Sequence, residues 1–69
     1  PEGLDLLQRL LKEAREGHYL RENAVLLLEI GYKQGKILTR MAEQLWPDAI
    51  ITLQADLAGW DRLLQIETR

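Results

Sequence analysis

The side chains available for chemistry are few, and they exclude most covalent mechanisms. The chain contains no cysteine and no serine, and its single histidine is His18. Nucleophilic triads are usually built on serine or cysteine, and structural zinc sites use cysteine thiolates with histidines. The sequence therefore excludes the usual triads, cysteine-bound zinc and disulfide bonds.

Four charged residues stand where a sheet of the α/β class gathers its ligands. Glu29 lies near the end of an otherwise apolar segment, and Asp56, Asp61 and Arg62 belong to a later loop. Loops that follow parallel strands meet at the carboxyl edge of the sheet, so these four are candidate substrate-side residues. The alternatives are a solvated strand end for Glu29 and surface ion pairing in the loop.

Three further features favour structural roles. The turn from Gly31 to Lys36 contains two glycines, but it lacks the complete pattern of a phosphate-binding loop and is expected to be a plain connection. His18 follows Gly17, which we expect to end a helix in a left-handed conformation. Trp60 offers an apolar platform in the loop of Asp56.

The elements that position these residues follow from the spacing of apolar side chains. Residues 4–17 form an amphipathic pattern with Leu7, Leu11 and Ala14 on one side, which predicts a helix. Residues 24–30 are apolar at nearly every position, as in a strand of a parallel sheet that is covered on both faces. A buried helical turn is the alternative for this segment.

A second amphipathic helix is predicted over 34–46 and is ended by Pro47. Strands are predicted over 49–54 and 62–68. The connection between these two strands is too short for a parallel crossover, so they should pair antiparallel or lie close together. The predicted class is α/β, a β-α-β-β arrangement preceded by a helix, in one unit spanning residues 1–69.

Composition narrows the classes of partner. The chain has 69 residues, of which 46% are hydrophobic and 29% charged, with a net charge of −2 and the two signs interspersed. This balance argues against nucleic acid as a partner. The longest apolar run, 24–28, is too short to span a bilayer, and no secretory leader opens the chain, so we expect a cytoplasmic protein.

Several segments together resemble a known enzyme family. They are Gly3–Asp5, Leu26–Tyr32, Gln34–Gly35, Asp56–Gly59 and Asp61–Arg62. In this order and spacing they look like the C-terminal end of the protein-(glutamine-N5) methyltransferases that modify peptide-chain release factors, the HemK or PrmC family. Arg21–Asn23 stand where the family usually has Pro-Gly-Gly.

The resemblance implies a class I, S-adenosylmethionine-dependent, Rossmann-like enzyme in which these residues supply the last helix-strand-helix-strand-strand portion of the sheet. The family's Gly-rich donor loop and its Asn-Pro-Pro-Tyr signature are not in this chain, whose one asparagine is Asn23. We therefore expect a C-terminal fragment that holds no catalytic, cofactor-binding or metal-binding residue. S-adenosylmethionine would bind elsewhere in the parent enzyme.

The expected function is thus that of a scaffold and substrate-side portion of a release-factor methyltransferase, inactive when isolated. Its partners would be the remainder of the methyltransferase domain and, for the parent, a release factor. A stand-alone α/β interaction module and a fragment of another class I methyltransferase are the alternatives. Because 24–30 would expose an unpaired apolar edge, we expect the isolated chain to form a homo-oligomer.

Overall fold

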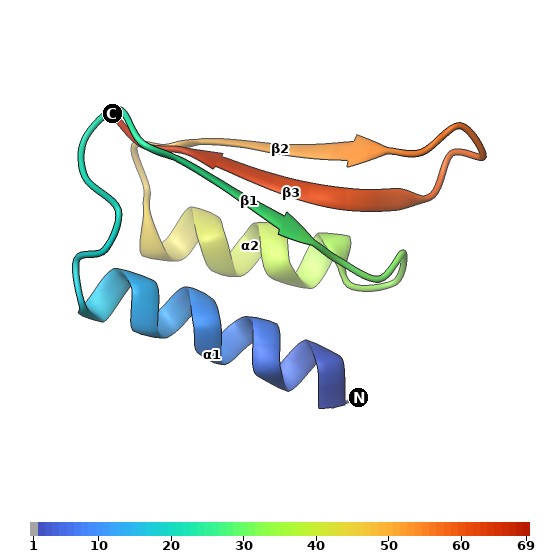
Figure 1. Cartoon of the computed structure of the whole chain (residues 1–69), viewed down its shortest axis with the longest axis horizontal. Coiled ribbons are helices and arrows are strands. Elements are labelled where there is room, and N and C mark those ends of the chain that lie inside the picture. Colours follow the sequence, from blue (N-terminus) through green and yellow to red (C-terminus); the bar gives the residue numbers. More distant parts are fainter. Residues whose placement is uncertain (1) are drawn as a thin grey trace.

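A computed structural model describes residues 2–69, and its five elements follow the predicted order (Figure 1). They are α1 (Glu2–Glu16), β1 (Val25–Glu29), α2 (Gly35–Leu45), β2 (Ile50–Ala55) and β3 (Asp61–Glu67). Each predicted boundary lies within two residues of the observed one. The mixed helix-and-sheet class and the order helix-strand-helix-strand-strand are confirmed.

The sheet is antiparallel, which differs from the parallel sheet that the sequence suggested. Its strand order is β1-β3-β2, and both outer strands pair with β3 in antiparallel fashion. The connection from β2 to β3 is a short hairpin, so β3 turns back beside β2. The other edge of β3 pairs with β1, which places β3 in the centre of the sheet. The strands β1 and β2 still run in the same direction, but they are not neighbours.

The two helices cover one face of this sheet, and the core lies between the layers (Figure 1). Its fully buried large side chains come from both helices and from the central strand: Leu11, Leu38, Leu64 and Ile66. Along β1 only alternate residues face this core, because side chains of a strand point to opposite faces in turn. The outward residues Val25 and Leu27 are each 55% exposed. The expectation that both faces of 24–30 are covered is therefore wrong within residues 2–69.

The helix α1 ends in a Schellman-type cap in which His18, not Gly17, takes the left-handed position. The amide of Tyr19 donates to the carbonyl of Ala14 at 3.0 Å, and the amide of His18 donates to Arg15 at 3.2 Å. His18 has φ 53°. At Gly17 itself, a Cβ would lie 2.5 Å from Cε2 of the exposed Tyr19 ring, so a side chain there would require that ring to move.

The buried Thr68 ties the start of β1 to the end of β3. Its hydroxyl accepts a hydrogen bond from the amide of Ala24 at 2.9 Å and lies within hydrogen-bonding distance of the carbonyls of Ala24 and Arg21. Its own amide donates to the carbonyl of Ala24 at 2.9 Å. No local sequence pattern indicates this role, because the partners of Thr68 are more than 40 residues away.

Replacing His18 by glycine should stabilise the fold. A side chain in the left-handed region costs about 1 kcal/mol, which glycine avoids. We therefore expect the free energy of unfolding of the His18→Gly variant, measured with urea, to rise by several tenths to about 1 kcal/mol. A His18→Ala variant serves as the control and should show no such gain. Equal stability of the glycine and alanine variants would contradict the assigned cap.

Candidate functional site

The candidate site lies at the end of the sheet where β1 and β2 both finish (Figure 1, right). Glu29 at the end of β1 and Gln54 near the end of β2 both stand opposite Leu63 of β3. The loops that follow, 30–34 and 56–60, therefore emerge at the same end. This placement agrees with the sequence expectation that Glu29 and the later loop share one edge.

The loop 56–60 is organised by one carboxylate. Asp56 Oδ1 accepts hydrogen bonds from the amides of Ala58 at 2.9 Å and Trp60 at 3.0 Å, and Oδ2 accepts from Arg62 Nε at 2.9 Å. The amide of Asp56 donates to the carbonyl of Trp60 at 2.9 Å. The Arg62 guanidinium above all, and then the Trp60 amide, hold the pKa of Asp56 below its usual value.

A β-bulge separates Asp61 from this pair. Gln54 is paired with Leu63 but its neighbour Ala55 is paired with Asp61, so Arg62 is an extra residue in β3. Asp61 is thereby brought against the first turn of α2, where a Cβ added to Gly35 would lie 2.8 Å from Asp61 Oδ2. The three charges predicted to cluster are thus divided between an Asp56–Arg62 pair and a carboxylate at a helix start.

Glu29 and Arg62 do share a hollow on the surface. It has a volume of about 410 Å³ and is lined by Glu29, Ile30, Arg62 and Leu63. The amide of Ile30 donates to the carbonyl of Arg62 at 2.9 Å, so the two chain segments are directly bonded at this point. A polar group placed in this hollow could donate a hydrogen bond to the Glu29 carboxylate and accept one from the Arg62 guanidinium.

The glycine-containing turn before α2 is closed by its own glutamine. The amide of Gly31 donates to Gln34 Oε1 at 2.7 Å, and the amide of Gln34 donates to the carbonyl of Gly31 at 2.9 Å. A phosphate cradle needs free backbone amides that point at the ligand. In this turn the Gly31 amide is already bonded, and the Asp61 carboxylate lies at the following Gly35.

Two aromatic side chains meet across the loops, and the sequence indicated only one of them. The ring centroids of Tyr32 and Trp60 are 4.8 Å apart and their planes are inclined at 60°. Lys33 Nζ lies 5.5 Å from the centroid of the Tyr32 ring, within the range of a cation–π interaction. The sequence could have indicated this contact, because Tyr32 and Trp60 lie in two loops that were expected at the same edge of the sheet.

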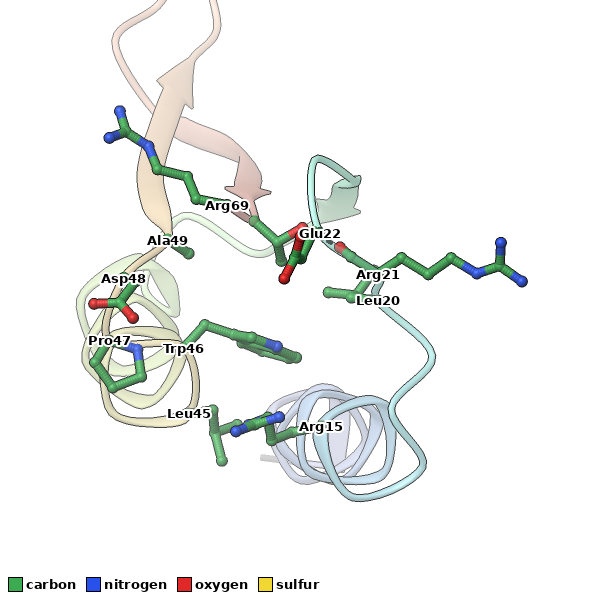
Figure 2. Close-up of a pocket in the computed structure, with 11 residues that line it drawn as sticks. Arg15, Leu20, Arg21, Glu22, Leu45, Trp46, Pro47, Asp48, Ala49 and Arg69 are labelled. Carbon is green, nitrogen blue, oxygen red and sulfur yellow. Dashed lines mark hydrogen bonds between the residues drawn. The ribbon is translucent and has the colours of Figure 1, made fainter.

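A separate cavity of about 210 Å³ lies at the other end of the molecule (Figure 2). The ring of Trp46 reaches from the end of α2 toward α1 and forms one wall, whereas Arg21 and Arg69 point away from the centre. The lining residues are Arg15, Leu20, Arg21, Glu22, Leu45, Trp46, Pro47, Asp48, Ala49, Thr68 and Arg69. This cavity contains none of the residues that the sequence singled out as site candidates.

Within residues 2–69, no group of three or more histidine, aspartate or glutamate side chains is placed to hold a metal ion. In the same part of the chain, neither helix has the length and hydropathy needed to cross a membrane.

Acidification should loosen the 56–60 turn. The pKa of Asp56 is lower in the folded turn than in the unfolded chain, so its stabilising effect is complete above the ordinary pKa of about 3.9 and is lost as the pH falls through the lowered folded-state value. In an NMR titration, the amide signals of Ala58 and Trp60 should shift together at a pH below this ordinary value. An Asp56→Asn variant should abolish that titration, and a wild-type midpoint at or above the ordinary value would contradict the assignment.

Three curated proteins are similar to the chain over most of its length, and all are named release factor glutamine methyltransferase. The protein of Lactococcus lactis is 29% identical over 66 residues, which make up 96% of this chain and 24% of the relative. The protein of Bacillus cereus is 32% identical over 66 residues, 96% of this chain and 23% of the relative. The protein of Enterococcus faecalis is 34% identical over 61 residues, 88% of this chain and 21% of the relative.

No protein-family model matches the chain, and no solved structure matches it at a significant level. The chain spans less than a quarter of the length of each of these three relatives. The resemblance that Leu26–Tyr32 and Asp56–Gly59 indicated is nevertheless confirmed. The chain is homologous to a segment of the release factor glutamine methyltransferases.

Proposed function

We propose that this chain is part of an enzyme that transfers a methyl group from S-adenosylmethionine to the side-chain nitrogen of a glutamine in a peptide-chain release factor. The observation that carries the proposal is the similarity of 88–96% of the chain to three enzymes of that name. The same proposal places the enzyme in the cytoplasm, together with its release-factor substrate.

The proposed role of residues 2–69 is that of a scaffold at the C-terminal end of a larger, Rossmann-like sheet. Two features support this role. Among the described residues β1 pairs only with β3, so its other edge can receive a further strand. The sheet face opposite the helices exposes Val25, Leu27 and Ile50, which is the apolar surface that a covering element from the remainder of the domain would need.

The glycine turn 31–35 does not fit the Gly-rich donor loop that the resemblance implies for S-adenosylmethionine. A glycine loop of this kind must leave its backbone open to the ligand. Here the Gly31 amide is bonded to Gln34, and the space above Gly35 is filled by Asp61. The proposal therefore places the methyl donor on other parts of the enzyme and assigns it no contact in residues 2–69.

Glu29, Asp56, Asp61 and Arg62 are proposed to shape the substrate side of the enzyme. Asp56 and Arg62 act together, because their ion pair holds the 56–60 loop in one conformation. Glu29 and Arg62 border the hollow at the end of β1. Asp61 acts indirectly through the position of α2, whose own first turn contains no acidic residue.

The test is a methyl-transfer assay with the complete reading frame that encodes residues 1–69. We expect the purified product to add one methyl group to a glutamine of the release factor, detected by mass spectrometry of the digested factor. The isolated 69-residue chain should transfer none and should show no calorimetric binding of S-adenosylmethionine near the micromolar range. Methylation of a small molecule or a nucleic acid instead would favour a different class I methyltransferase. A complete reading frame without any methyl-transfer activity would contradict the proposal.

We also propose that the isolated chain associates with itself. The free edge of β1 and the exposed Val25 and Leu27 offer backbone hydrogen bonds and apolar area, and two copies need to bury only about 1,200 Å² in total to form a specific dimer. Analytical ultracentrifugation over about a hundredfold range of concentration should show a species heavier than the monomer. A Leu27→Lys variant should shift the equilibrium toward the monomer, and a wild-type chain that stays monomeric throughout would contradict self-association.

A further inference from the structure

The aromatic pair formed by Tyr32 and Trp60 is only half covered by the rest of the chain. The two rings join the loops 30–34 and 56–60 in a tilted contact, with 4.8 Å between the ring centroids. Tyr32 nevertheless remains 46% exposed and Trp60 50% exposed. Tryptophan and tyrosine are the residues most often found at the energetic centre of protein interfaces, where their large rings lose water.

The backbone under both rings is held in place before any partner arrives. The Trp60 amide donates to Asp56 Oδ1 at 3.0 Å, and its carbonyl accepts from the Asp56 amide at 2.9 Å. On the other loop, Gly31 next to Tyr32 is fixed by its hydrogen bond to Gln34. Because little freedom of these loops remains to be lost, burial of the rings by a partner would carry a small entropic cost.

The shape of this surface fits a macromolecule better than a small ligand. Small-molecule sites are concave and enclose most of the ligand, whereas the two rings lie on protruding loops and neither lines the hollow beside Glu29. That hollow lies close to the two rings along the chain, since Ile30 and Arg62 line it and are two residues from Tyr32 and Trp60, respectively. The amide of Ile30 also donates a hydrogen bond to the carbonyl of Arg62 at 2.9 Å. An extended polypeptide can cover the rings and place a polar group between Glu29 and Arg62.

We infer that the Tyr32–Trp60 pair is a contact surface for the protein substrate. This inference rests on the proposed function and adds two residues to the substrate side of the enzyme. The pair contributes affinity for the release factor and takes no part in the transfer of the methyl group. Its loss should therefore raise the KM for the protein substrate and leave kcat and the affinity for S-adenosylmethionine unchanged.

The test compares variants of the complete enzyme with purified release factor as the substrate. For Trp60→Ala we expect the KM for the factor to rise about thirtyfold, as for removal of an interface hot spot, with kcat within about twofold of wild type. Trp60→Phe keeps an aromatic ring against Tyr32 and should recover most of the affinity. Tyr19→Ala is the matched control and should leave the KM unchanged, because Tyr19 is also an exposed aromatic residue but follows α1, outside both loops.

Hydrogen exchange of the wild-type enzyme tests the same inference without a variant that could fail to fold. Addition of release factor should slow hydrogen exchange of the amides in loops 30–34 and 56–60. If the wild-type enzyme is active, two results would overturn this inference but not the proposed function. One is a KM of Trp60→Ala equal to that of the wild type, and the other is the absence of protection in both loops of the wild type. A wild-type enzyme that methylates no release factor would instead overturn the proposed function on which the inference rests.

Discussion

The position of β3 between β1 and β2 is the constraint on which the rest of the structure depends. The last strand of the chain is the centre of the sheet, and its buried residues Leu64 and Ile66 carry the contact with the helices. The pairing of Val25 with Glu67 joins residues that are more than 40 positions apart. Such distant pairs are costly to form early, so the sheet can be completed only after the C-terminal residues are available.

The two ends of the sheet are finished in different ways. At one end, Thr68 supplies side-chain and backbone hydrogen bonds that extend the pairing of β1 and β3 beyond the strands themselves. At the other end, two loops are closed by their own side chains, Asp56 in one and Gln34 in the other. The first end is thus joined by contacts between distant segments. The second combines these local turns with two contacts between distant segments, the hydrogen bond from Ile30 to Arg62 and the ring contact of Tyr32 with Trp60.

The unequal faces of the sheet link the fold to the proposed function. One face is covered by α1 and α2, while the other exposes alternating residues of β1 and β2 to solvent (Figure 1). A chain of this size has little surplus stability, and exposed apolar area beside an unpaired strand edge favours association. Either the remainder of a larger domain or a second copy of this chain could cover the exposed apolar face and pair with the free edge of β1, since each can supply a strand and an apolar surface.

The sequence by itself determined the identity and order of the elements. The helical spacing of Leu7, Leu11 and Ala14 and the continuous apolar run after Ala24 identify α1 and β1 because local periodicity reflects local geometry. The short 55–61 connection likewise predicted that the last two strands pair antiparallel or lie close together, and the structure shows the antiparallel pairing. Segments such as Leu26–Tyr32 and Asp56–Gly59 carried the resemblance to the release factor methyltransferases, since family motifs are also read along the chain.

Only the tertiary structure decided which side chains meet. Asp56, Asp61 and Arg62 are close in sequence, yet the bulge at Arg62 brings Asp61 to the start of α2 and leaves the other two paired. Tyr32 and Trp60 are distant in sequence, yet the shared end of β1 and β2 brings their rings together. In both cases the strand register sets the side-chain directions, and register depends on hydrogen bonds between distant segments that no local pattern encodes.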